Sequence, residues 1–219
     1  MLRKTLRDNK FFFIPYLIFV LSPIPFLFHY SKGDLHLLIN QYHTGFFDVL
    51  FALLTYLGDG WFLLIPAVIL LFYSLRHFTF LLTAYFSTGL ITQILKRVFF
   101  EDVLRPSKLL KDADLYLIEG VDMLSGRSFP SGHSTSAFAL FLCLALISKN
   151  NYIKLICLLF ACLVAFSRVY LSQHFLMDII AGSLIGCIGT LAVYQLFYKD
   201  ERKWHAWTLQ KAFKHEQQA

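Results

Sequence analysis

The chain has 219 residues and a formal net charge of +6 at pH 7, and 57% of its residues are hydrophobic but only 16% are charged. So apolar a composition excludes an ordinary soluble globule. Nucleic-acid binding is also excluded, because no stripe of alternating basic and aromatic residues accompanies the positive charge.

Six apolar runs approach the length of about 20 residues that a helix needs to cross a bilayer core. In chain order they cover 11–29, 60–75, 78–95, 133–148, 152–170 and 175–197. The segment 34–58 is apolar but interrupted by polar residues, which favours two short interfacial helices; the alternative is a seventh span over 46–58. We therefore predict an all-α polytopic membrane protein, with 1–219 as one domain and the six spans as its bundle.

The positions of Lys and Arg predict the orientation of these spans. An even number of spans places both tails on the same side, and the bias of Lys and Arg favours the cytoplasm for that side. The tail 199–219 is then cytoplasmic, and the long polar loop 97–130 is external. A loop of this length in a compact protein usually has a function. The small size and the lack of a eukaryotic targeting signal favour the bacterial inner membrane, with the site in the periplasm.

The stretch 167–178 places Arg168, His174 and Asp178 between two apolar runs. Ionisable groups beside hydrocarbon are costly and tend to persist where they have a role. Asp178 lies one helical turn after His174, so its carboxylate can orient the imidazole as a nucleophile or base. The alternative is that Arg168 reaches the interface and that the other two side chains pair locally.

Two further clusters of polar and charged residues lie at the ends of apolar runs, one at the start of a run and one at its end. Ser131, Gly132 and His133 begin one run, where the free amides of a helix start can bind an anion or be capped by Ser131. Lys96 and Arg97 end another run, with Arg105 in the loop that follows. These cations either mark an interface and a loop turn or, with the imidazoles, form a phosphate site.

The three clusters resemble the signature of the type 2 phosphatidic acid phosphatase superfamily, which also contains vanadium haloperoxidases and glucose-6-phosphatase. That signature runs Lys-x6-Arg-Pro, Pro-Ser-Gly-His and Ser-Arg-x5-His-x3-Asp. The chain matches the second motif at 130–133 and the third at 167–178, and the resemblance covers 60–197.

The first motif departs from the family pattern. Its Lys would fall on Val98, whereas the cations are Lys96 and Arg97, so eight residues separate Lys96 from Arg105 in place of six. Either cation is a candidate ligand. We favour Lys96, because Lys-Arg is a common form of this motif and a longer turn at 99–104 would return Lys96 to the site.

The resemblance implies a covalent mechanism without a metal or another cofactor. His174 would attack phosphorus and form a phosphohistidine, Asp178 would orient it, and His133 would act as acid and then as base. The oxygens of the phosphate would be held by Lys96, Arg105, Ser131, Gly132 and Arg168.

The resulting hypothesis is an integral-membrane lipid phosphatase, in which the bilayer and its lipids are the partners and no obligate protein partner is indicated. The substrate would be a polyprenyl diphosphate, phosphatidylglycerophosphate, phosphatidic acid or lipid A. A lipid phosphotransferase with the same site is the alternative enzyme. A non-enzymatic anion-binding or transport protein is the other class, but the interiors of the six runs lack the charges it would need.

Overall fold

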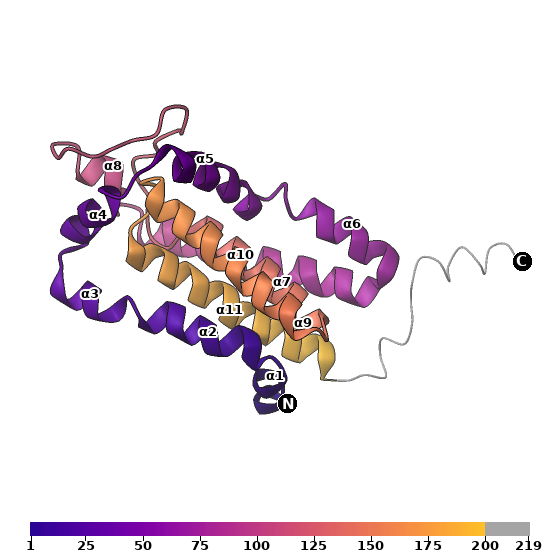
Figure 1. Cartoon of the computed structure of the whole chain (residues 1–219). Coiled ribbons are helices and arrows are strands. Elements are labelled where there is room, and N and C mark those ends of the chain that lie inside the picture. The colour runs from indigo at the N-terminus through magenta and orange to yellow at the C-terminus, as the bar shows by residue number, and fades with distance from the viewer. Residues whose placement is uncertain (200–219) are drawn as a thin grey trace, which may run out of the picture.

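The computed structural model describes residues 1–199, which are helices and loops without a strand (Figure 1). The all-α prediction is confirmed for this part of the chain, and the predicted tail beyond 199 lies outside the described residues. The helices are α1 (Leu2–Asp8), α2 (Lys10–Leu21), α3 (Ile24–His29), α4 (Lys32–Asn40), α5 (Gly45–Leu54), α6 (Leu64–Tyr73), α7 (Leu75–Ile94), α8 (Pro106–Leu109), α9 (Gly132–Ile147), α10 (Asn151–Tyr170) and α11 (Leu176–Tyr198).

Four helical segments of the described chain are long and apolar enough to cross a membrane: Lys10–His29, Leu75–Phe99, Asn151–Tyr170 and Leu176–Tyr198. A fifth is possible if Lys32–Asn40 and Gly45–Gly58, bent by 118°, form one broken span. The predicted spans at 60–75 and 133–148 are the shorter apolar helices α6 and α9, of 10 and 16 residues. Length and composition thus support four or five spans, and six stays a prediction.

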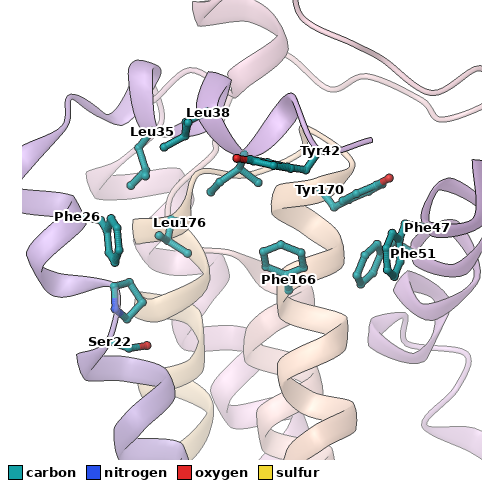
Figure 2. Close-up of a pocket in the computed structure, with 12 residues that line it drawn as sticks. Ser22, Phe26, Leu35, Leu38, Tyr42, Phe47, Phe51, Phe166, Tyr170 and Leu176 are labelled. Carbon is teal, nitrogen blue, oxygen red and sulfur yellow. The ribbon is translucent and has the colours of Figure 1, made fainter. Parts of the chain in front are cut away.

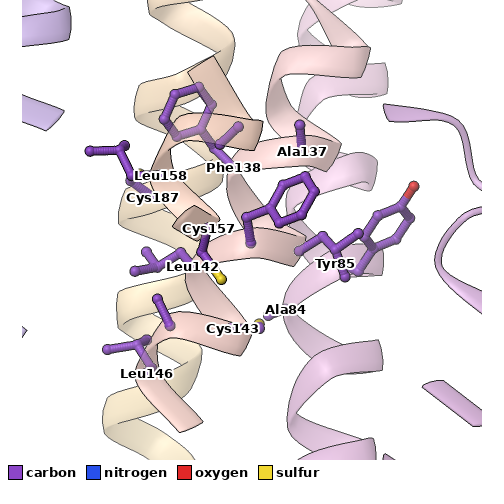
Figure 3. Close-up of a cluster of buried hydrophobic side chains, with 14 of the residues drawn as sticks. Ala84, Tyr85, Ala137, Phe138, Leu142, Cys143, Leu146, Cys157, Leu158 and Cys187 are labelled. Atoms are coloured by element: carbon purple, nitrogen blue, oxygen red, sulfur yellow. The ribbon is translucent and has the colours of Figure 1, made fainter. Parts of the chain in front are cut away.

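The helix α9 lies at the centre of the bundle, against α7, α10 and α11 (Figure 1). It is apolar on all sides, which is the pattern of a helix surrounded by protein. Figure 3 shows Phe138 and Leu142 of α9 among Tyr85 of α7, Cys157 of α10 and Cys187 of α11. The start of α9, where the second motif lies, is therefore fixed by packing around the whole helix.

The backbones of α9 and α11 approach closely at Gly182. A Cβ atom at this position would lie 2.4 Å from the carbonyl oxygen of Ser131 and 3.0 Å from Cβ of Ser134. The same contact region includes a hydrogen bond from the amide of Ser131 to the carbonyl of Asp178, at 3.0 Å. Because Gly182 has no side chain, the two helices can approach closely enough for the second and third motifs to lie side by side.

The segment 34–58 forms the two helices that the sequence predicts, α4 and α5. The hydroxyls of Ser31 and Thr44 cap them by accepting backbone N–H bonds at 3.2 and 3.4 Å. A single 3₁₀ turn, Thr55–Gly58, follows α5 and packs against α9 and α10. The loop 97–130 contains one short helix, α8, and returns to the same end of the bundle (Figure 1).

We predict that Gly182→Ala destabilises the protein, because its new methyl group would meet backbone atoms that cannot move aside. Forcing a methyl group into a well-packed contact costs about 1–3 kcal/mol, which should appear as a lower midpoint of thermal unfolding in detergent. Gly89→Ala on α7 is the matched control, since a Cβ atom there meets nothing within 4 Å. Equal midpoints for the two variants would contradict the close approach.

Candidate active site

The loop Leu171–Phe175 joins α10 to α11 and carries His174, which is only 1% exposed. The carbonyl of Arg168 accepts the amides of Gln173 and His174, at 2.9 and 3.0 Å, so the loop continues directly from the end of α10. Asp178 lies in the first turn of α11, where a carboxylate is favoured by the helix dipole. The two candidate residues therefore sit on a turn that both helices fix.

The carboxylate of Asp178 orients the imidazole of His174. Its Oδ2 atom accepts from the amide of Phe175 at 3.0 Å and from the hydroxyl of Ser128 at 2.5 Å, and it lies 3.2 Å from His174 Nδ1. We assign the ring proton to Nδ1, because this nitrogen faces the carboxylate. The lone pair is then on Nε2.

The other nitrogen of His174 faces positive charge. Nε2 lies 3.4 Å from NH1 of Arg105. Burial, together with the nearby cations Arg105, Lys96 and Arg168, lowers the pKa of His174 well below its ordinary value. The imidazole is therefore neutral at neutral pH, which is the form that can act as a nucleophile.

Three cations surround this imidazole, and each is less than a tenth exposed: Lys96, Arg105 and Arg168. Carbonyl and hydroxyl oxygens orient them. Lys96 Nζ donates to the carbonyl of Arg127 at 2.9 Å, Arg105 donates to the carbonyls of Gly126 and Gln173, and Arg168 NH1 donates to Thr55 Oγ1 at 2.6 Å.

None of these three cations forms an ion pair with a carboxylate within residues 1–199. In the same part of the chain, Nε of Arg168 is buried without a hydrogen-bond acceptor. Buried charges are costly unless they are paired. The cluster is therefore built to receive an anion, and guanidinium groups match the oxygens of a phosphate.

The structure separates the two candidates of the first motif. Lys96 is buried in the cluster and Arg97 is exposed. The helical segment Leu95–Phe99 is a π-turn, in which the amide of Phe100 donates to the carbonyl of Leu95 at 3.0 Å. This wider turn, common at functional sites, and the turn after it accommodate the extra residues between Lys96 and Arg105.

The second imidazole, His133, is the second residue of α9 and lies two positions after the N-cap Ser131. Its Nε2 atom lies 2.7 Å from Oδ1 of Asp59. Both side chains line a cavity of about 500 Å³, together with Arg168, Thr55 and Gln173. Of the eight residues that the sequence predicts for the site, His133 and Arg168 line this cavity. Ser131 and Gly132 lie at the start of α9 beside His133, Arg105 and Asp178 contact His174, and the charge of Lys96 acts on His174.

Four polar residues of this site carry no predicted role in the sequence analysis: Thr55, Asp59, Ser128 and Gln173. Ser128 lies close before the second cluster, and Gln173 directly precedes the candidate nucleophile His174, so position along the chain could have indicated both. Asp59 reads from sequence as a turn residue, although a carboxylate at the end of an apolar segment is the same signal that selects Asp178.

A family model described as the PAP2 superfamily matches residues 77–202, which is more than half of the chain. The chain belongs to the PAP2 superfamily. This family is the one that the sequence motifs resemble, so the predicted membership is confirmed.

Curated relatives of this PAP2 protein include phosphatases of lipids. It is 30% identical over 87 residues to a lipid A 4'-phosphatase of Bacteroides thetaiotaomicron, a match that spans 40% of this chain and 39% of the relative. It is 38% identical over 94 residues to lipid phosphate phosphatase 1 of Arabidopsis thaliana, spanning 37% and 29% of the two chains. The chain thus spans about two fifths or less of the length of these relatives.

Two solved structures have folds similar to that of this chain. LpxE of Aquifex aeolicus matches with a TM-score of 0.66 and 31% identity, over 74% of this chain and 93% of that one. A PAP2-type phosphatidylglycerolphosphate phosphatase of Bacillus subtilis matches with a TM-score of 0.65 and 23% identity, over 89% and 98% of the chains. The apolar helices and these neighbours make this PAP2 protein an integral membrane protein.

We expect Lys96→Met to weaken the binding of inorganic vanadate or phosphate at least tenfold, because it removes a buried cation from the anion site. Arg97→Met is the matched control, since it removes the neighbouring but exposed cation and should leave binding unchanged. Calorimetric titration of the purified variants compares them. A loss confined to Arg97→Met would transfer the first-motif role to Arg97.

Proposed function

We propose that this protein is a membrane lipid phosphatase that hydrolyses phosphate mono- or diphosphate esters through a phosphohistidine on His174. The observation that carries the proposal is the position of the neutral imidazole of His174, which Asp178 orients, beside three buried cations. Within residues 1–199, none of these cations forms an ion pair with a carboxylate. A tetrahedral phosphate would satisfy the cations and place its phosphorus within reach of Nε2.

In the first step, the lone pair of His174 Nε2 attacks phosphorus in line, and the bond from phosphorus to the ester oxygen breaks. The electron pair of that bond stays on the leaving oxygen, which takes a proton from the imidazolium of His133. Lys96, Arg105 and Arg168 stabilise the charge on the equatorial oxygens, and Ser131 and the amide of Gly132 hold the phosphate at the start of α9.

In the second step, neutral His133 takes a proton from water, and the hydroxide oxygen attacks phosphorus as the bond to Nε2 breaks. The electron pair returns to His174, phosphate leaves, and both histidines regain their starting states. Because the three fixed cations supply the charge that metal ions supply in many phosphoryl-transfer sites, we propose that no metal is needed.

A lipid substrate is supported by an apolar groove of about 630 Å³ beside the site (Figure 2). Phe26 of α3, Leu38 of α4 and Phe166 of α10 line it, and Leu176, next to the catalytic loop, reaches its wall. One acyl or prenyl chain of a bilayer lipid would occupy this groove while the headgroup reaches the cations. Phosphatidic acid, phosphatidylglycerophosphate, polyprenyl diphosphate and lipid A are the candidate substrates.

We also propose the topology of six crossings, with α6 and α9 as short spans completed by their flanking residues. This arrangement keeps both tails in the cytoplasm by the distribution of Lys and Arg. The cluster around His174 then opens on the periplasmic side of a bacterial inner membrane, where it would meet lipids of the outer leaflet.

We expect His174→Ala to abolish phosphate release, by a factor of about 10⁴ or more, because the change removes the proposed nucleophile. Detergent-purified protein is assayed on the four candidate lipids with and without EDTA. His29→Ala, which changes an exposed histidine at the end of α3, is the matched control and should retain full activity.

Release that needs an added metal ion would contradict the metal-free mechanism, and activity in His174→Ala would contradict the nucleophile. Transfer of the phosphate to an acceptor lipid in place of water would redefine the enzyme as a phosphotransferase. Vanadate binding without turnover of any lipid would favour the non-enzymatic, anion-binding function.

We expect Leu38→Trp to lower kcat/KM several-fold for a long-chain lipid phosphate, because the larger side chain narrows the apolar groove. A short-chain phosphate, which does not extend into the groove, should keep its kcat/KM. Val68→Trp, on the exposed face of α6, is the control and should change neither value. A loss of equal size for both chain lengths would show that the groove does not hold the lipid chain.

A further inference from the structure

The segment Thr55–Asp59 lies outside all three motifs and yet contacts two residues of the site. Oδ1 of Asp59 lies 2.7 Å from Nε2 of His133, and Thr55 Oγ1 accepts from NH1 of Arg168 at 2.6 Å. At Gly58, a Cβ atom would lie 2.8 Å from Val164 and 3.2 Å from the ring of His133. A side chain at position 58 would therefore push the segment away from the imidazole that Asp59 contacts.

We propose that Asp59 is a positioning residue that aligns His133 for its part as the general acid and stabilises the protonated form of its imidazole. The proposal rests on the proposed phosphatase function and adds a fourth element, α5 with its 3₁₀ turn, to the elements that the three motifs identify.

The charges around His133 explain why it needs a carboxylate. Burial is the largest effect that disfavours the charged form of this imidazole, and the cations Arg168 on α10 and Lys96 on the π-turn add to it. Within residues 1–199, Asp59 is the carboxylate that pairs with it. The hydrogen bond from His133 lowers the pKa of Asp59, so the carboxylate stays ionised and offsets the two cations.

The position of the pair allows the proton to be passed on. The side chains of His133 and Asp59 are 29% and 34% exposed, so their contact lies at the wall of the cavity and a substrate can reach it. In the free enzyme Nε2–H donates to Asp59. When an ester oxygen enters, it replaces Asp59 as the acceptor and takes the proton as its bond to phosphorus breaks.

The carboxylate does not change its own protonation state in this cycle. After the first step, His133 is neutral and its nitrogen lone pair is free to accept the proton of water in the second. Asp59 then again stabilises the imidazolium that this transfer restores. The same side chain therefore assists both halves of the reaction, without contact to the phosphate.

The test is Asp59→Asn on two phosphate monoesters of similar chain length, one with an alkyl and one with a nitrophenyl leaving group. An alkoxide needs a proton to leave, whereas a nitrophenolate does not. We expect kcat to fall at least tenfold for the alkyl ester, as general-acid catalysis contributes about 10²–10⁴-fold, and less than threefold for the nitrophenyl ester. Asp102→Asn, which removes an exposed carboxylate of the loop, is the control.

The pH dependence gives a second readout. Because the carboxylate stabilises the imidazolium, the basic limb of kcat/KM should move to lower pH in Asp59→Asn, while the ionisation of the substrate is common to both proteins. Nuclear magnetic resonance of the histidine rings should show the same shift for His133 in the enzyme without substrate. Asp59→Glu, which keeps the charge, should restore much of the loss.

An equal loss for both esters with unchanged pH limb and ring titration would overturn the proposal, as would full activity in Asp59→Asn. If Asp59→Asn also lowers the unfolding midpoint, two results decide whether the loss of activity is structural: the activity of Asp59→Glu, and the titration of the His133 ring in the Asp59→Asn protein that remains folded. A different result would contradict the proposed phosphatase function itself: wild-type protein that releases phosphate from neither ester and from none of the lipids.

Discussion

The cations Lys96, Arg105 and Arg168 repel one another, and their burial beside His174 costs free energy that the rest of the fold must offset. The protein offsets it mainly with dipoles. Backbone carbonyls from the loop 97–130 and from the turn 171–175 accept the hydrogen bonds of Lys96 and Arg105, and the hydroxyl of Thr55 accepts that of Arg168. Charge balance is left for a ligand, so the long loop 97–130 has a structural role: its carbonyls orient the cations of the candidate site.

The turn 171–175, which carries His174, is held from both sides. Gly182 lets α11 approach α9, while α4 reaches the turn at Ser172, whose hydroxyl lies 3.0 Å from His36 Nε2 and accepts from Asn40 Nδ2 at 3.3 Å. Ser172 has a φ of +52°, a backbone conformation that needs such support. Asp48 of α5 extends the same network, since Tyr170 and Tyr116 both donate to it. The N-terminal helices therefore stabilise the site.

The sequence was sufficient to predict features that depend on residues close together in the chain. Helix class, the two helices in 34–58 and the cluster at 167–178 follow from periodicity and from the cost of charges beside apolar runs. It favoured Lys96 over Arg97 only through the common form of the motif, because the π-turn that sets which side of the helix faces the site is not visible in the sequence. It could not find Asp59, whose partner is more than seventy positions away. Apolarity alone also could not give the length of α9, which is apolar because protein surrounds it.

The two histidines of the proposed mechanism differ in environment in the way their roles require. His174 is 1% exposed, faces three cations and has its pKa lowered, so it stays neutral and nucleophilic. His133 lies at the cavity wall, and its Nε2 atom faces the carboxylate of Asp59, whereas Nε2 of His174 faces the guanidinium of Arg105. The segment that ends in Asp59 thus opposes, at His133 alone, the combination of burial and positive charge that keeps His174 neutral.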